Sequence, residues 1–424
     1  MPRFHEQWNL LFDSDSEDEE RDAGAFIVLG ALQADRLRRL RRSATRQYLT
    51  RPQLLPDPRE NTSWTRLYEH GDDRAYITCM GFNRAGFEYI LNNGYADAWN
   101  SNTIPRPDTS AHGAPRLGRR SLDAAGALGL ALHYLCSCVD DTDISLIFAI
   151  IPTTISRYIS WSLKILLDIL REMPEAQIPW PDEDDCAEYS ILIEQKYSLL
   201  GGGIGFCDGL KIRVTVSDDP DIENATYNGW LHAHFESCVF VFSPRGIIIG
   251  AVINVPGSWH DSNVARPIFE KLLYETPAGY FLIADTAFPR GDRRIAGRIK
   301  APLKQDSRLP DDPQERAQLL EFNRQLVQSR QAAEWGMHSM RTSFGRLNIP
   351  LDVNDKEGRA TLLEVCTRLH NLRAETVGIN EIRQVYEPTW RTEEDDIFFR
   401  MERLVLRDVR RHDRVARFHR LTDV

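Results

Sequence analysis

One stretch of the sequence, residues 201–344, constrains the fold more than any other. It contains two short apolar runs, IGFC and YFLIA, and each is followed directly by an aspartate, Asp208 and Asp285. A glutamate, Glu334, follows in a segment whose spacing predicts a helix. Short apolar runs between turn signals are typical of buried strands. The stretch therefore predicts a sheet with carboxylates at its strand ends and a third carboxylate on a helix.

The same stretch predicts an ordered set of elements. Strands are expected at residues 204–207, 237–242, 247–255, 280–284 and 298–303, and helices at residues 263–274 and 314–344. Residues 211–216 either extend the first strand or begin another. A hairpin turn at residues 244–246 makes the first three strands antiparallel, and the later strands are expected to be parallel. This order is that of an α/β fold with a ribonuclease H-like mixed sheet.

The region before the sheet is predicted to be helical. Residues 121–138 form an apolar helix, 144–149 a short helix with Asp143 as its N-cap, and 153–170 a longer amphipathic helix after a turn. This outline is typical of a helix-turn-helix, but an ordinary helical bundle has it too. In the first case, the DNA-facing start of the recognition helix carries Thr153, Thr154, Ser156 and Arg157.

Composition divides the chain into four parts. We expect a disordered acidic and basic tail at 1–62, a helical region at 63–180, an α/β domain at 181–375 and a basic helical tail at 376–424. No apolar run approaches the ~20 residues of a membrane span, so no membrane partner is expected. The N-terminus lacks the pattern of a secretory signal, which predicts a protein inside the cell. The seven cysteines form no CxxC pair, which favours reduced thiols over a zinc site.

Basic charge is concentrated in three segments although the net charge is −10. Residues 36–51 hold seven arginines and no acid, and residues 290–304, with Arg293 and Arg294, hold six basic residues and one acid. The third is a stripe near the C-terminus: Arg400, Arg403, Arg407, Arg410, Arg414 and Arg417. Each segment could bind phosphates by releasing counterions, or could be a solvated surface.

The carboxylates at the strand ends suggest phosphoryl-transfer chemistry. Two-metal cleavage of a phosphodiester needs a few carboxylates that converge on the ions. Hard cations such as Mg²⁺ or Mn²⁺ prefer these oxygen ligands. We expect Asp208 to bridge two ions, with Asp285 and Glu334 each holding one. Each aspartate could also simply terminate a strand, so the prediction depends on the three residues occurring in this order.

Other polar residues are candidates for supporting roles. Asp261 and His260 lie at a predicted helix start, where they act as auxiliary residues near DNA or merely as a helix cap. On the last helix of the stretch, Arg330 and Arg341 share a face with Glu334. They are expected to contact DNA phosphates beside the metal site, although a solvated face would look the same.

Several motifs of this region, taken together, resemble one family. They are DGL, YNGW, NVPGSWHDS, ADTAFP and RQAAEWGMHSMRTSFGRL. As a group they resemble the DDE endonuclease domain of PIF/Harbinger-type transposases, with the fungal branch and its domesticated relatives most similar. The resemblance covers residues 121–373. Two motifs depart from the family, since DGL replaces DGT and ADT replaces GDS, but neither departure removes a carboxylate.

The resemblance implies a function for the whole chain. It implies a nuclear transposase that uses Mg²⁺ or Mn²⁺ to cut double-stranded DNA at terminal inverted repeats and to transfer the strand. It places the catalytic carboxylates at Asp208, Asp285 and Glu334, and Asp261 in an auxiliary motif. Related transposases often act with a Myb-like DNA-binding protein, which is a candidate partner beside further copies of this chain. The alternatives are a domesticated, non-cleaving DNA-binding or interaction protein and a nuclease unrelated to transposition.

Overall fold

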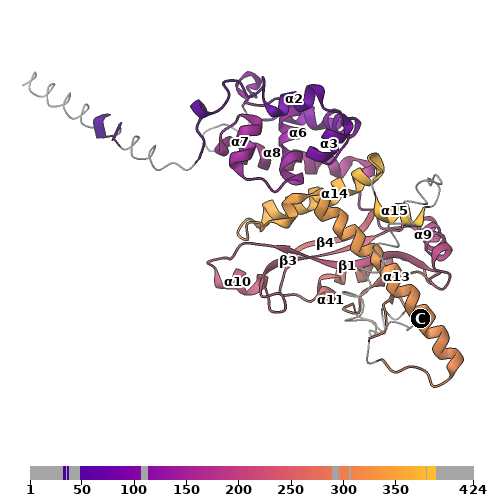
Figure 1. The fold of residues 1–424 in the computed structure, drawn as a ribbon. Coiled ribbons are helices and arrows are strands. Elements are labelled where there is room, and N and C mark those ends of the chain that lie inside the picture. The colour runs from indigo at the N-terminus through magenta and orange to yellow at the C-terminus, as the bar shows by residue number, and fades with distance from the viewer. Residues whose placement is uncertain are drawn as a thin grey trace, which may run out of the picture. The chain divides into compact units, whose positions relative to one another are not determined.

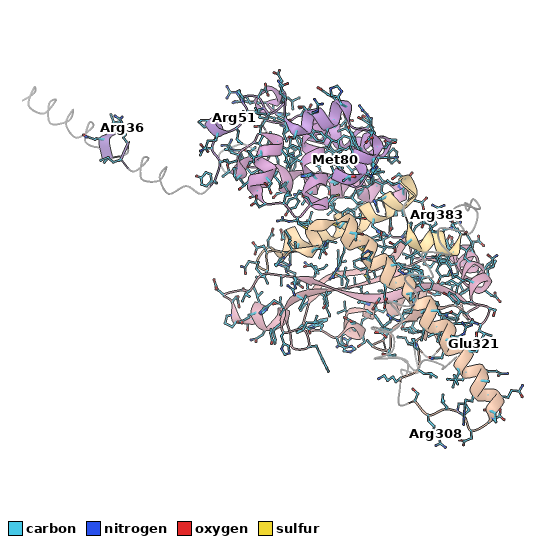
Figure 2. All side chains as sticks on the ribbon, in the orientation of Figure 1. Arg36, Arg51, Met80, Arg308, Glu321 and Arg383 are labelled. Atoms are coloured by element: carbon cyan, nitrogen blue, oxygen red, sulfur yellow. The ribbon has the colours of Figure 1, made fainter. Side chains whose placement is uncertain are left out.

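The computed structural model describes residues 32–34, 36–37, 48–106, 113–288, 295, 297–304, 307–378 and 380–387. Two compact units divide the chain, residues 1–53 and 54–424. The first includes the short 3₁₀ helix η1 (Arg51–Gln53) and the exposed Arg36 (Figure 2). Some predictions fall outside the described residues: the acidic tail, most of the arginine-rich segment 36–51, Arg293, Arg294 and the C-terminal arginine stripe.

The part of the second unit that precedes the sheet consists of helices. They are α2 (Ser63–His70), α3 (Asp73–Met80), α4 (Arg84–Ile90), η2 (Leu91–Tyr95), α5 (Ala96–Ser101), η3 (Leu117–Arg119), α6 (Ala124–Cys136), α7 (Asp141–Phe148), α8 (Pro152–Glu172), η4 (Pro174–Ala176) and α9 (Glu183–Lys196). The apolar helix α6 is buried along most of its length and packs on α8. It therefore forms the centre of this helical region, as its composition predicts.

The helices α7 and α8 meet at 89°. Ala149, with a φ of 51°, ends α7, and Pro152 begins α8, where its missing N–H costs nothing. The N-cap of α7 is Asp140, whose side chain accepts the Thr142 and Asp143 N–H groups, so the prediction of Asp143 as the cap is wrong. Among the described helices, no single one is long and apolar enough to cross a membrane; α7 and α8 pass that test only as a bent pair.

The sheet is mixed, as predicted. Its strands are β1 (Gly203–Arg213), β2 (Tyr227–Asn228), β3 (Ala233–Phe242), β4 (Ile248–Pro256), β5 (Phe281–Ala284) and β6 (Ile299–Lys300). The strand β3 pairs antiparallel with β1, β2 and β4, and β5 pairs parallel with β1 and β6. The first strand of the chain thus lies at the centre, between β3 and β5. This arrangement is consistent with a ribonuclease H-like core after a helical region.

The structure differs from the predicted elements in several details. Of the two alternatives for residues 211–216, it shows the extension: β1 continues through Asp208 to Arg213 while it pairs with β3, so Asp208 lies within the strand and not at its end. A helix that was not predicted, α10 (Pro220–Thr226), precedes β2. The helix expected at 263–274 is two helices, α11 (Asp261–Val264) and α12 (Arg266–Tyr274), because a proline in the first turn begins a new helix.

Helices cover both faces of the sheet. The long helix α13 (Pro313–Ser343) and α14 (Lys356–Thr376) pack on the face that carries Phe206 and Phe242. The helix α12 packs on the other face, with Val239 and Val241. The short helices η5 (Gly345–Asn348) and α15 (Glu381–Tyr386) follow α13 and α14. Figure 1 shows α13 and α14 along one side of the strands and α11 on the other.

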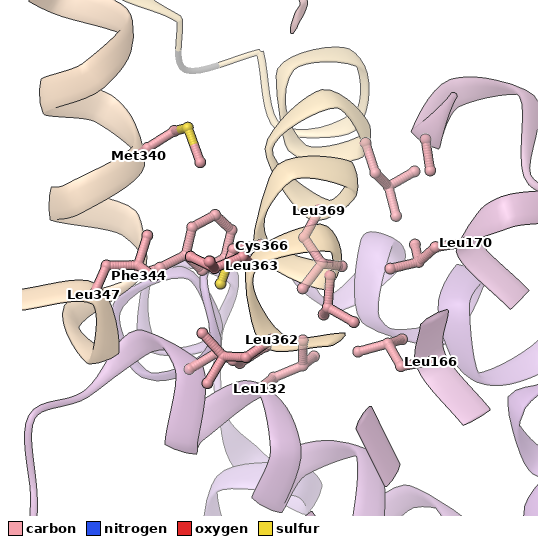
Figure 3. Packing of buried hydrophobic residues seen from close by; sticks show 14 of the residues in the cluster. Leu132, Leu166, Leu170, Met340, Phe344, Leu347, Leu362, Leu363, Cys366 and Leu369 are labelled. Carbon is pink, nitrogen blue, oxygen red and sulfur yellow. The ribbon is translucent and has the colours of Figure 1, made fainter. Parts of the chain in front are cut away.

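The helix α14 joins the helical region to the sheet. It packs against α8 on one side and β4 on the other. In Figure 3 its side chains lie between those of α13 and those of α6 and α8; the labelled residues of α14 are Leu362, Leu363, Cys366 and Leu369. These apolar residues belong to one continuous core, so the helical region and the sheet bury their apolar surface together.

A buried ion pair fixes α14 on the sheet. Arg359 donates to the Glu236 carboxylate of β3 at 2.8 Å and to the Asn254 side chain of β4 at 3.2 Å. It also donates to the backbone carbonyls of Asp352 and Val353. Both charged side chains are 6% exposed. Burial raises the pKa of Glu236, against the opposing effect of Arg359. A buried carboxylate of this kind is stable only with its cation in place.

We therefore expect Arg359→Met to destabilise the protein strongly. Loss of the guanidinium leaves the Glu236 carboxylate buried and unpaired, which should cost about 3–5 kcal/mol of unfolding free energy. Urea denaturation measures the change. The double variant Glu236→Gln with Arg359→Met should lose less, because no buried charge remains unpaired. Equal losses in the single and double variants would contradict this account.

Candidate active site

Two of the three predicted carboxylates lie at neighbouring positions on adjacent parallel strands. The last paired residues of β1 and β5 are Cys207 and Ala284, and Asp208 and Asp285 follow them directly. Side chains alternate along a strand, and Phe206 and Ile283 point into the core beneath α13. Asp208 and Asp285 therefore lie on the face that α13 covers.

Each aspartate is oriented by a neighbouring backbone amide. The Gly209 N–H donates to Asp208 Oδ1 at 2.8 Å, and the Thr286 N–H donates to Asp285 Oδ1 at 2.6 Å. In both cases the second carboxylate oxygen is left for other partners. β5 ends where β1 continues along β3, so the two side chains lie where the central strand loses one neighbour.

The third carboxylate, Glu334, is carried across this face by α13, which contacts β1, β3 and β5. A close approach at Gly336 sets its height above the sheet. A Cβ atom at Gly336 would lie 2.6 Å from the buried Phe242 ring of β3. Because that ring is fully buried, it has little room to move. The glycine two residues beyond Glu334 thus lets α13 lie close to the strands.

The three residues Asp208, Asp285 and Glu334, called the carboxylate cluster below, surround an arginine of the same helix. Arg330 Nη2 lies 2.6 Å from Glu334 Oε1, and Arg330 Nη1 lies 3.7 Å from Asp208 Oδ2. The Arg330 side chain is 12% exposed. Its Nε is buried and has no hydrogen-bond acceptor in the described part of the chain. One guanidinium therefore serves as the cation of the cluster.

The closeness of these groups shifts their pKa values. Burial raises the pKa of Asp208 to about 7, although the Arg330 guanidinium and the Gly209 N–H favour the ionised form; Asp285 and Glu334 raise it further. Burial alone would lower the pKa of Arg330, but Glu334, Asp208 and Asp285 outweigh burial and raise it. The cluster thus behaves as three acids that share one buried cation.

In chemical kind, the carboxylate cluster fits a hard divalent cation. All its donors are carboxylate oxygens, the ligands that Mg²⁺ and Mn²⁺ prefer. The cluster also already holds a cation, the Arg330 guanidinium. In arrangement, Arg330 stands where such an ion would compete for the same oxygens. Within the described residues, no group of three or more His, Cys, Asp or Glu side chains is close enough together to hold a metal ion.

The predicted auxiliary residues lie on the other face of the sheet. Asp261 pairs with Lys211 at 2.9 Å, and Lys211 is three residues beyond Asp208 on β1, so its side chain points the opposite way. A Cβ atom at Gly209 would lie 2.7 Å from the Asp261 carboxylate, which places Asp261 directly against the β1 backbone. His260 is exposed and forms the N-cap of α11.

The residues predicted to bind DNA are in several places. Thr153 and Ser156 are exposed in the first turns of α8, and Arg157 Nε donates to the Thr153 carbonyl at 3.1 Å. Thr154 is half-buried beside them. Arg341 is exposed at the end of α13 and donates to the Lys211 carbonyl at 2.7 Å. Their role in binding DNA stays a prediction, as does that of Arg330.

Sequence reasoning missed two of these contacts. The spacing of Arg330 and Glu334 was a visible signal, since residues four apart on a helix are neighbours. The spacing did not show that Asp208 and Asp285 of the sheet lie opposite this part of the helix. The pairing of Lys211 with Asp261 had a weaker signal, because the alternation along β1 separates Lys211 from Asp208.

Comparison with known families places part of the chain beside one of them. Residues 207–371 match the family model described as DDE superfamily endonuclease. The match begins one residue before Asp208 and contains the whole carboxylate cluster. It supports placing this region in the DDE transposase superfamily and a nuclease-like or transposase-like function. No curated protein and no solved structure matches the chain significantly.

The close approach at Gly336 generates a stability prediction. Gly336→Ala should lower the unfolding free energy by about 1–3 kcal/mol, because the added methyl group overpacks against Phe242. In an open helix position the same change would stabilise by about 1 kcal/mol. Gly118→Ala is the control, since no atom of the described residues would lie within 4 Å of its Cβ. Equal unfolding midpoints in urea for Gly336→Ala and wild type would contradict the close packing.

The pKa of Asp208 generates a pH prediction for the protein in EDTA. The folded pKa of about 7 exceeds the value of about 3.9 for an unfolded aspartate. The folded state therefore binds the proton more tightly, and this stabilisation is full below pH ~4 and is lost as the pH rises to ~7. Asp208→Asn cannot titrate. Because about three pKa units correspond to about 4 kcal/mol, the melting temperature of wild type should fall by roughly 5–10 °C relative to this variant between pH 4 and 7. Parallel curves would contradict the raised pKa.

Proposed function

We propose that this chain is a metal-dependent DNA endonuclease and transposase of the PIF/Harbinger type that acts in the nucleus. The observation that carries the proposal is the carboxylate cluster: two aspartates at neighbouring positions on adjacent strands, with a glutamate above them on α13. The DDE superfamily match across residues 207–371 supports the same class. The motifs named above favour the PIF/Harbinger branch.

In this function Asp208, Asp285 and Glu334 would hold Mg²⁺ or Mn²⁺. When bound, two such ions supply a nucleophilic oxygen and stabilise negative charge on the phosphate during hydrolysis and strand transfer. The protein sets the positions of the three carboxylates. Asp208 and Asp285 are fixed where the pairing of β1 with β5 ends and by backbone N–H groups, and Glu334 is fixed by the packing of α13. Little reorganisation of the backbone is then needed when substrate binds.

The substrate in this proposal is double-stranded DNA at terminal inverted repeats. The start of α8, with Thr153, Thr154, Ser156 and Arg157, would contact a groove, and Arg341 would contact the backbone near the site. Arg293 and Arg294 would add positive charge. A Myb-like DNA-binding protein and further copies of this chain are the partners that the proposal includes.

A second candidate function is DNA binding without cleavage. The observation that favours it is the engagement of Arg330 with Asp208 and Glu334, which neutralises part of the cluster without any metal ion. A domesticated relative that no longer cuts DNA could keep this arrangement for stability alone. Cleavage distinguishes the two functions.

We expect purified protein with Mn²⁺ to cleave DNA that carries the ends flanking its own coding region. Asp285→Asn should reduce the rate by about a thousandfold or more, because a lost metal ligand removes several kcal/mol of transition-state stabilisation. Product formation on a denaturing gel measures the rate.

The matched control is Asp168→Asn on α8, which changes an aspartate outside the carboxylate cluster and should leave cleavage intact. The test is repeated with nuclear extract to supply a missing partner protein. Binding of the DNA by wild type and by Asp285→Asn, without cleavage by either even in extract, would reject the endonuclease and favour the second candidate.

A further inference from the structure

Arg330 is held in an unusual place for an arginine on a long helix. Its guanidinium reaches Glu334 at 2.6 Å and Asp208 at 3.7 Å, and only 12% of its side chain is exposed. Its Nε is buried without an acceptor in the part of the chain that the structure describes. A guanidinium normally uses all its N–H groups when it is buried for structure alone. The Arg330 contacts that the structure shows are with carboxylates, so the carboxylates set the position of the guanidinium.

The charges around Arg330 do not balance. Three carboxylates act on it, and it carries a single positive charge. Arg359, elsewhere in the core, has one carboxylate, one amide oxygen and two backbone carbonyls as acceptors. The Arg359 site is thus fully paired, whereas the cluster around Arg330 retains excess negative charge. A cluster with excess negative charge has a higher affinity for a doubly charged cation.

From this contrast we infer that Arg330 is a positioning residue that takes the place of the metal. It holds Asp208 and Glu334 together in the metal-free protein, and its guanidinium must leave these oxygens when a divalent cation binds. This inference rests on the proposed function of the carboxylate cluster as a metal site. It adds a competition between a side chain of the protein and the ion for the same carboxylates.

The competition predicts opposite effects on metal affinity and on stability without metal. Arg330→Gln removes the competing cation, so the dissociation constant for Mn²⁺, measured by calorimetry, should fall by about tenfold or more. In EDTA the same variant should melt at a lower temperature than wild type, because the carboxylates repel one another. Mn²⁺ should then raise its melting temperature more than it raises that of wild type. A merely structural role predicts weaker Mn²⁺ binding and no such recovery.

Three further variants complete the experiment. Arg330→Lys keeps the charge but lacks the planar fork, so its Mn²⁺ affinity should lie between wild type and Arg330→Gln. It also serves as the test if the glutamine variant does not fold. Arg324→Gln on the same helix breaks a pair with Glu321 and should leave Mn²⁺ affinity unchanged. Asp208→Asn should abolish the binding.

The outcomes separate this inference from the proposed function. If Asp208-dependent Mn²⁺ binding is present in wild type, and Arg330→Gln and Arg330→Lys bind equally or more weakly, the competition is overturned while the metal site stands. If neither wild type nor the Arg330 variants bind Mn²⁺ through Asp208, the metal site itself is rejected, and the competition with it. Tighter binding by both Arg330 variants, with unchanged binding by Arg324→Gln, is the expected result.

Discussion

The placement of three like charges on one covered face of a sheet is the constraint on which this structure depends. At about 4 Å, two unit charges repel by about 1 kcal/mol in water and by about 4 kcal/mol near a protein surface. Burial adds the cost of removing Asp208 from water, which its raised pKa records. Arg330 offsets part of this cost, because its guanidinium lies within ion-pair distance of Asp208 and Glu334. The helix α13 thus delivers both one carboxylate of the cluster and the cation beside it.

The course of α13 in turn depends on contacts distant from the cluster. Gly336 lets it approach the Phe242 ring, and α14 packs beside it through the shared apolar core. Arg359 then fixes α14 to β3 and β4 through Glu236 and Asn254. A displacement of α14 would be transmitted to α13 because the packed core does not compress. The buried ion pair and the close glycine contact therefore help to set the position of Glu334 and Arg330 without touching the carboxylate cluster.

How far the site could be predicted differs from residue to residue. The aspartates were visible because each follows an apolar run, and the order of strands placed those runs side by side. The extent of β1 could be given only as one of two alternatives, because its second half is held by pairing with β3, a strand distant in the sequence. The pairing of Arg330 with Asp208 was also not visible, since helical spacing shows only which residues share a face. Long-range pairing and docking decide both features, and neither leaves a local pattern.

The alternation of side chains along β1 separates two sets of charges. Asp208 points to the face of α13, and Lys211, paired with Asp261, points to the other. Asp261 therefore lies across the strand from the carboxylate cluster. The two sides come together at Gly209: a Cβ atom there would lie 2.7 Å from the Asp261 carboxylate, and its N–H donates to Asp208. A residue larger than glycine there would collide with Asp261, so the two faces are connected through a position where only a bare backbone fits.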